Sequence, residues 1–179
     1  MASGKEMKKI DLAKEMILKN SGLFRCPVCE QELSLSRSNS LYCSKGHNYD
    51  LAKQGYVNLL LKQEKSGYDK QLFAARKVIS ASGFFDPMRK AISKVVWEIG
   101  KDEAWSEVSI LDAGCGEGSH LAWLCRDLKA KKKGFADLLG VGIDLSKEGI
   151  RVAAKEYQGL IWCVADLTKL PLQNQQFDI

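Results

Sequence analysis

Four potential metal ligands crowd into a short stretch near the N-terminus, and no other feature restricts the fold of this chain as strongly. Cys26 and Cys29 are separated by two residues, and Cys43 and His47 follow after a short stretch of β-like composition. Two such pairs are typical of a structural zinc ribbon, in which four ligands close a tetrahedron and leave no position for water. A module of about forty residues buries little apolar surface, so the metal would supply folding free energy. We therefore expect these four residues to bind Zn²⁺.

The other three cysteines, Cys115, Cys125 and Cys163, lie within or near predicted strands and helices. Six cysteines could form disulfides, but the first residues lack the apolar segment of a secretory signal. No window is apolar over eighteen or more residues, as a membrane-spanning helix would require. We expect a cytoplasmic chain with reduced thiols, in which Cys125 and Cys163 are small buried hydrophobic residues.

Charge is distributed unevenly along the 179 residues, whose net charge is +5. Residues 1–70 carry twelve Lys or Arg against eight Asp or Glu, whereas residues 108–179 carry nine of each. A basic N-terminal part points weakly to nucleic acid, and a solvated surface is the simpler interpretation.

Apolar strands and amphipathic helices alternate from residue 108 onward. Strands are predicted at 108–114, 138–146, 160–167 and from 177, with helices at 119–130 and 146–157. This alternation predicts an α/β fold with a parallel sheet and right-handed crossovers.

The chain before this region has a different character. A helix is predicted at 5–19, a polar linker at 62–68, and two connector helices at 70–82, capped by Asp69, and from Asp86 to about Gly100. The apolar face predicted for the second connector helix consists of Met88, Ala91, Ile92, Val95, Val96 and Ile99.

A glycine-rich loop joins the first of these strands to its helix. It reads Asp112-Ala-Gly114-Cys-Gly116-Glu117-Gly118, a GxGxG spacing rather than the GxGxxG of a dinucleotide site. Glycines at the carboxyl end of a strand let a ligand approach the backbone closely. The absence of the GxGxxG spacing also makes a nicotinamide dehydrogenase a poor alternative.

Acidic residues end three successive strands: Asp112, Asp144 and Asp166. An acid at the end of the second strand, here Asp144, commonly binds ribose hydroxyls. Asp166, at the end of the third strand, could accept a hydrogen bond from the amine of adenine. Either could instead be a turn or cap residue. Together they describe a ligand with a nucleoside and a short polar chain, which is S-adenosylmethionine.

These segments carry a family resemblance. LDAGCGEG, GIDLS and VADL resemble the first motifs of class I Rossmann-like methyltransferases, and CPVCEQEL with CSKGHNYDLAKQGYVNLL looks like the N-terminal module of bacterial 23S rRNA guanine-N1 methyltransferases of the rRNA large-methyltransferase A type. The connector FAARKVISASGFFDPMRKAI also resembles that family. The resemblance runs from about Phe24 to the end of the chain.

The resemblance implies methyl transfer from S-adenosylmethionine to guanine N1 in a hairpin loop of 23S rRNA, near the peptide exit tunnel. Cys26, Cys29, Cys43 and His47 take the zinc positions, and Asp144 and Asp166 take the ribose and adenine positions. Phe85 stands where the family has an aromatic residue near the cofactor. In total, the resemblance implies eight cofactor-binding positions: Phe85, Asp112, Gly114, Gly116, Glu117, Gly118, Asp144 and Asp166.

No general base can be identified. His120, the only other histidine, is more consistent with a structural place near the cofactor. RNA loops are bound through stacking and phosphate contacts, for which the ribbon offers Tyr42, Tyr49, Tyr56, Arg25, Arg37, Lys45 and Lys53. The alternatives are a small-molecule methyltransferase with a zinc ribbon and a non-catalytic RNA-binding protein; a homodimer stays open.

We expect four parts: an extension at 1–21, a zinc ribbon at 22–61, a linker and connector at 62–107, and the first half of a methyltransferase domain at 108–179. A class I sheet usually has seven strands, so we expect a fragment that binds zinc but does not methylate by itself.

Overall fold

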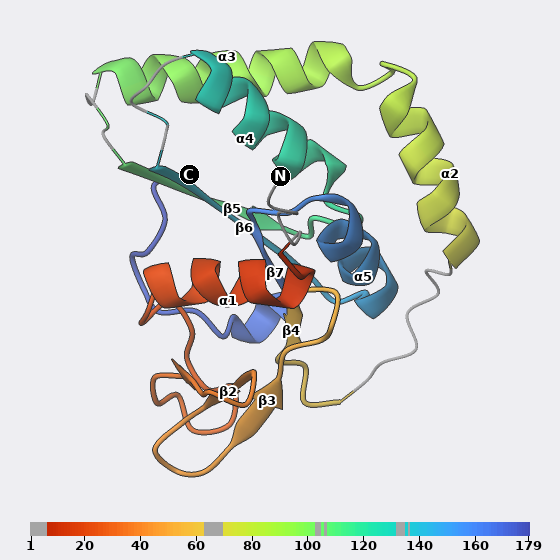
Figure 1. The fold of residues 1–179 in the computed structure, drawn as a ribbon. Coiled ribbons are helices and arrows are strands. Elements are labelled where there is room, and N and C mark those ends of the chain that lie inside the picture. The colour runs from red at the N-terminus through yellow and green to blue at the C-terminus, as the bar shows by residue number, and fades with distance from the viewer. Residues whose placement is uncertain (1–6, 63–69, 103–104, 106, 132–134, 136) are drawn as a thin grey trace, which may run out of the picture.

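The computed structural model describes residues 7–62, 70–102, 105, 107–131, 135 and 137–179. The predicted polar linker, apart from Lys62, and the capping role of Asp69 lie outside these ranges. A small antiparallel sheet and a four-stranded parallel sheet form the framework, with helices packed around the larger one (Figure 1). Within the described residues, no helix has both the length and the apolarity needed to span a membrane.

The predicted alternation of strands and helices is confirmed from residue 107 onward. Its elements are β5 (Glu107–Ala113), α4 (Ser119–Lys131), β6 (Asp137–Asp144), α5 (Lys147–Glu156) and β7 (Ile161–Val164), followed by a 3-10 turn, η2 (Leu167–Lys169). The three strands pair in parallel. Ser146 begins α5 as its N-cap, because its side chain accepts a hydrogen bond from the amide of Gly149.

The last residues run along the free side of β5. The Leu111 amide donates to the Ile179 carbonyl at 2.9 Å, and the Ile179 amide donates to the Ser109 carbonyl at 3.3 Å. This alternation is the hydrogen-bond pattern of parallel strands. Asp178 and Ile179 are therefore hydrogen-bonded along β5 where the sequence predicts the start of a strand, but no strand is assigned at 177–179.

The N-terminal module contributes a strand to the larger sheet. The small sheet contains β1 (Ser34–Leu35), β2 (Ser40–Tyr42) and β3 (Asn48–Asp50), while β4 (Tyr56–Asn58) pairs in parallel with β7. The order of the larger sheet is β4-β7-β6-β5. A ribbon ending at residue 61 thus includes a strand that belongs to the methyltransferase-like sheet.

Side chains of β7 alternate between two apolar cores. Trp162 and Val164 face a core built with α4 and α5, whereas Ile161 and Cys163 face a second core. The second core also contains residues of the ribbon and of α1 (Lys9–Lys19), the helix predicted at 5–19. Because both faces of the sheet are covered, the ribbon and the sheet are packed as one body (Figure 1).

Two connector helices, α2 (Lys70–Ala81) and α3 (Asp86–Asp102), meet at a turn containing Gly83, whose φ is +84°. The helix positions are as predicted, but of the six residues of the predicted apolar face of α3 only Val96 is buried. Met88, Ile92, Val95 and Ile99 are more than 40% exposed, and the buried residues are Arg89, Ser93, Val96 and Gly100. Polar side chains occupy the buried face because Arg89 and Ser93 have hydrogen-bond partners on α2 and α4.

Candidate functional site

The four predicted zinc ligands converge. One ligand atom from each of Cys26, Cys29, Cys43 and His47 lies within 4.8 Å of all the others. Cys29 Sγ is 3.6 Å from Cys43 Sγ, and His47 Nδ1 is 3.5 Å from Cys26 Sγ and 3.3 Å from Cys43 Sγ. The edges of a tetrahedral Cys₃His zinc site are roughly 3.5 to 3.8 Å, given Zn–S bonds of about 2.3 Å. The donor set and its spacing therefore fit a structural zinc ion.

Two tight turns present these ligands. In the first, the Cys26 amide donates to Gln31 and its carbonyl accepts from Glu30; in the second, the Cys43 amide donates to His47 and its carbonyl accepts from Gly46. Gly46 has a φ of +85°, which glycine adopts without steric cost. The ligand turns are thus formed by backbone hydrogen bonds.

Tyr49 contacts one of the predicted zinc ligands without being a ligand itself. Its hydroxyl lies 3.3 Å from Cys26 Sγ. Burial opposes ionisation of the Cys26 thiol, but hydrogen bonds from Tyr49 and from backbone amides outweigh it and lower the Cys26 pKa to about 6. A thiolate is the form that binds zinc, so this arrangement favours metal binding near neutral pH.

The glycine loop follows β5 and is tied to the end of β6. The amides of Gly114 and Cys115 donate to the Ile143 carbonyl at 2.8 and 3.1 Å, and the Gly116 amide donates to Asp144 Oδ2 at 2.8 Å. Gly114, Gly116 and Gly118 all have positive φ values, of +91°, +58° and +80°. Gly114 is exposed, whereas Gly116 is covered by Phe73 and Arg76 of α2. The loop therefore opens outward at Gly114.

Three carboxylates lie close to one another at the glycine loop. Burial raises the pKa of Asp112 to about 6, and the negative charges of Asp144 and Glu117 contribute to the same rise. Asp144 also binds the Ser146 amide through Oδ1 at 2.7 Å, and Glu117 binds the amide and hydroxyl of Ser119. Asp144 and Glu117 thus stabilise the loop and the start of α4, while the three acids together create a negative site.

The other two predicted cofactor residues lie in the segment after β7 and in the turn between α2 and α3. Asp166 accepts hydrogen bonds from the amide and hydroxyl of Thr168, each at 2.8 Å, which lower its pKa and cap η2. Phe85, in the turn between α2 and α3, packs edge-on against His120 with ring centroids 4.9 Å apart. Asp166 therefore has a local capping role, and Phe85 lies beside the first turn of the glycine-loop helix.

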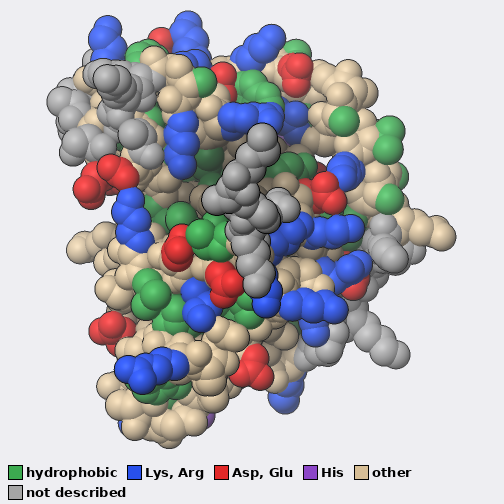
Figure 2. All heavy atoms as spheres, viewed as in Figure 1, with side chains coloured by type: hydrophobic (Ala, Val, Ile, Leu, Met, Phe, Trp, Pro, Cys, Tyr) green, Lys and Arg blue, Asp and Glu red, His purple; other side chains and the backbone are tan. Residues whose placement is uncertain are grey.

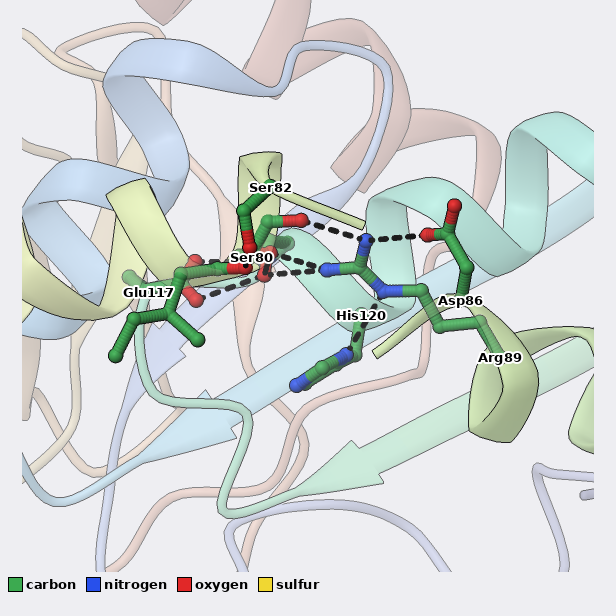
Figure 3. A network of polar contacts seen from close by, with 8 residues as sticks. Ser80, Ser82, Asp86, Arg89, Glu117 and His120 are labelled. Atoms are coloured by element: carbon green, nitrogen blue, oxygen red, sulfur yellow. Dashed lines mark hydrogen bonds and ion pairs between the residues drawn. The ribbon is translucent and has the colours of Figure 1, made fainter. Parts of the chain in front are cut away.

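A buried arginine at this place was not predicted from sequence. Arg89 is 6% exposed and binds Ser80, Ser119 and His120 (Figure 3). No local sequence pattern identifies Arg89, because the burial of Arg89 and of Ser93 one turn later depends on partners on α2 and α4.

The remaining sequence candidates divide by burial. Cys115, Cys125 and Cys163 are buried free thiols whose pKa values are raised by burial. Of the three ribbon tyrosines, Tyr56 is core and Tyr49 contacts the zinc cluster, whereas Tyr42 is 46% exposed. Arg25 donates to the Leu170 carbonyl at 3.2 Å. Arg37, Lys45 and Lys53 are all exposed at the surface of the ribbon.

The carboxyl edge of the parallel sheet matches S-adenosylmethionine in charge and leaves backbone access at Gly114. A Cβ on Gly114 would meet only Leu167, at 3.9 Å, so the loop leaves room for a ligand against its backbone. The cofactor carries a positive sulfonium and a positive amine, and Asp112, Glu117 and Asp144 supply negative charge there. The arrangement defines the cofactor half of a methyltransferase domain, placed behind a zinc ribbon.

Comparisons with known proteins agree with both parts. Residues 24–67 match the zinc-ribbon family described as "RlmA, N-terminal", and residues 110–179 match the family described as "Methyltransferase domain". The Bacillus subtilis protein YxjB, named as a candidate 23S rRNA (guanine-N(1)-)-methyltransferase, is 42% identical over 159 residues, which are 88% of this chain and 54% of that protein. A Streptomyces fradiae protein named 23S rRNA (guanine(748)-N(1))-methyltransferase is 33% identical over 152 residues, or 84% of this chain and 51% of that protein.

The chain therefore contains an RlmA-type zinc ribbon and a methyltransferase-domain segment, and it is similar over most of its length to proteins named 23S rRNA (guanine-N1)-methyltransferases. It spans about half the length of the curated relatives it matches. A methyltransferase domain implies S-adenosylmethionine as methyl donor, and the Cys₃His cluster implies zinc.

Proposed function

We propose that this chain is the zinc-ribbon and cofactor-binding part of an enzyme that methylates guanine N1 in a hairpin loop of 23S rRNA. One observation carries the proposal: the Cys₃His ribbon and the glycine loop with its three acids are packed into one body through β4. The relatives described above are named as 23S rRNA (guanine-N1)-methyltransferases and match most of this chain. The proposed location is the cytoplasm, where ribosomal RNA is made in bacteria.

The proposed cofactor residues have separate tasks. S-adenosylmethionine, when bound, supplies an electrophilic methyl group on its sulfonium. Gly114 gives the ligand access to the backbone, and Gly116 holds the loop in place through its bond to Asp144. Asp112, Glu117 and Asp144 balance the positive charge of the ligand, and Asp166 and Phe85 lie at its rim. Guanine N1 carries a proton at neutral pH, so catalysis also needs that proton removed and N1 aligned with the methyl group. The described residues supply the positioning, and no base among them is assigned.

The ribbon is the proposed contact for the RNA hairpin. Tyr42 is an exposed aromatic side chain suited to stacking on an unpaired base, and Lys45 and Lys53 are exposed cations suited to phosphates. Lys and Arg side chains are also prominent over α4 and α5 (Figure 2), where Arg126, Lys129 and Lys155 are exposed. Replacing Lys45 and Lys53 by alanine should weaken RNA binding and flatten its salt dependence. An unchanged affinity and salt slope would exclude ribbon contacts.

Methyl transfer separates this proposal from its main alternative, a small-molecule methyltransferase. The protein expressed from its complete gene is assayed with labelled S-adenosylmethionine. One set of reactions contains 23S rRNA from a strain that lacks the gene, and the other contains phenolic and quinone acceptors. We expect label in the rRNA alone. Label in a small acceptor, with none in RNA, would support the alternative. Binding of RNA without cofactor binding or transfer would support a non-catalytic RNA-binding protein.

A further inference from the structure

The guanidinium of Arg89 joins three helices at the glycine loop. From α3, its Nη1 donates to the Ser80 carbonyl of α2 at 3.1 Å, and Nη2 donates to the Ser80 hydroxyl. Nη2 also donates to the Ser119 hydroxyl of α4 at 3.2 Å (Figure 3). A planar guanidinium is suited to several fixed acceptors at once, and Lys has no such fork. Arg89 therefore fastens the connector to the helix that begins at the glycine loop.

The same contacts continue to an acid of the proposed cofactor site. The Ser119 hydroxyl donates to Glu117 Oε1 at 2.7 Å, and the Ser119 amide donates to Glu117 Oε2 at 2.8 Å. Glu117 is 6% exposed and Ser119 is 7% exposed, so both groups are held away from solvent. Hydrogen bonds to charged groups contribute more when they are shielded from water. The orientation of Glu117 thus depends on Ser119, which is in turn fixed by Arg89.

Arg89 also determines which nitrogen of the His120 ring carries the proton. Its Nε donates to His120 Nδ1 at 3.1 Å. A ring nitrogen that accepts a hydrogen bond is unprotonated, so the remaining proton of a neutral imidazole is on Nε2. The second ring nitrogen points away from Arg89 (Figure 3).

The imidazole borders a cavity beside the proposed cofactor site. His120, Asp112 and Ile179 are among the residues that line this space of about 200 Å³. The charged groups around the ring are Arg89 of α3, Arg76 of α2, Glu117 of the loop, and Asp112 across the cavity. Desolvation and the two arginines lower the pKa of His120, which keeps the ring neutral.

We propose that Arg89 is a positioning residue: it locks the α2–α3 connector to the Glu117 end of the glycine loop and holds His120 in its Nε2–H tautomer. This inference rests on the proposed function, because it assigns Arg89 to the cofactor site of the same enzyme. Arg89 lies outside the glycine loop, and its contacts predict that a change in the α2–α3 connector alters cofactor binding at the loop.

The first test reads the tautomer directly. The chain has only two histidines, so ¹⁵N-histidine labelling gives two ring systems, and the variant His120→Gln identifies the signals of His120. The wild type should show Nε2 protonated and Nδ1 unprotonated. Arg89→Met should give a mixture of tautomers and a higher titration midpoint, and Arg89→Lys, which keeps the charge, should lose the tautomer preference alone. Lys94→Met, an exposed cation on the same helix, is the matched control.

The second test measures coupling to the loop. Affinity for S-adenosylmethionine is compared in Arg89→Met, Ser119→Ala and the double variant, with zinc content and circular dichroism confirming that each is folded. Each single variant should bind roughly tenfold more weakly, and the double variant should be no weaker than the singles. An unchanged His120 tautomer in Arg89→Met, or fully additive losses of affinity, would overturn the proposal. Failure to methylate guanine would instead reject the proposed function and leave both of these readouts unaffected.

Discussion

Val57 pairs with Cys163 in parallel, and this pairing joins the zinc module to the methyltransferase sheet. Cys163 also lies in the same apolar core as the zinc ligands Cys26 and Cys43. Because one apolar core contains residues of the ribbon and of the parallel sheet, we expect a bound metal to stabilise the sheet as well as the ribbon. If the ribbon were attached only by a flexible linker, loss of zinc would unfold the ribbon and leave the sheet unchanged.

Zinc removal should therefore destabilise the parallel sheet as well. We expect a strong chelator to lower the melting temperature by about 10 °C or more in a single transition. Hydrogen exchange should show loss of protection in β7 along with the ribbon. Cys43→Ser should reproduce the effect, whereas Cys125→Ala, which replaces a buried thiol outside the cluster, should still respond to chelator. Protection of β7 that survives zinc loss would show that the two parts fold independently.

Asp112 should make stability decrease as pH rises. Its pKa of about 6 lies above the unfolded value of 3.8, so the folded chain holds this proton more tightly. The folded state is therefore penalised as pH passes from about 4 to about 6, by an amount on the order of 3 kcal/mol at neutral pH. Asp112→Asn should then be more stable than wild type at pH 7.5 and nearly equal to it at pH 4 in urea denaturation.

Asp166 is the matched control for this experiment because its pKa is lowered by Thr168. A lowered pKa has the opposite sign, so its contribution is present at neutral pH and lost in acid. Asp166→Asn should be less stable than wild type at pH 7.5. A stabilising effect of Asp166→Asn, or no effect of Asp112→Asn, would contradict the assigned environments.

Gly118 fits a tight contact beneath the glycine loop. A Cβ there would lie 2.5 Å from Trp162 and 2.8 Å from Ala153, and its φ is +80°. Gly159 has a similar φ of +76°, but a Cβ there would meet nothing within 4 Å. Gly159→Ala should cost about 1 to 2 kcal/mol for its backbone alone, and Gly118→Ala several kcal/mol more from overpacking. Equal losses of unfolding free energy in the two variants would show that the contact with Trp162 is unimportant.

Local patterns predicted most of the fold. The spacing of Cys26, Cys29, Cys43 and His47 predicted their convergence, because short turns within a ribbon determine where such ligands point. Ser146 could be identified as a cap, and the strands of the glycine-loop region were recognisable from their apolar runs. These features depend on residues close together in sequence.

Features that depend on distant partners were missed. Tyr56–Asn58 looks like a ribbon strand until β7, about a hundred residues later, pairs with it. Most of the apolar stripe of α3 is exposed, and Arg89 and Ser93 are buried beside Val96 because they find partners on α2 and α4. A polar residue at a buried helix position can be recognised only when the group that satisfies it is known.

Primer extension on 23S rRNA detects the proposed methyl group itself. A methyl group on guanine N1 blocks base pairing, so reverse transcriptase stops next to the modified nucleotide. RNA from cells carrying the complete gene should show one strong stop at a guanine in a hairpin loop. That stop should be absent from a deletion strain, restored by the wild-type gene, and reduced in a strain carrying Cys43→Ser or Asp112→Ala. An identical pattern of stops in the wild-type and deletion strains would contradict the proposal that this protein methylates guanine N1 of 23S rRNA.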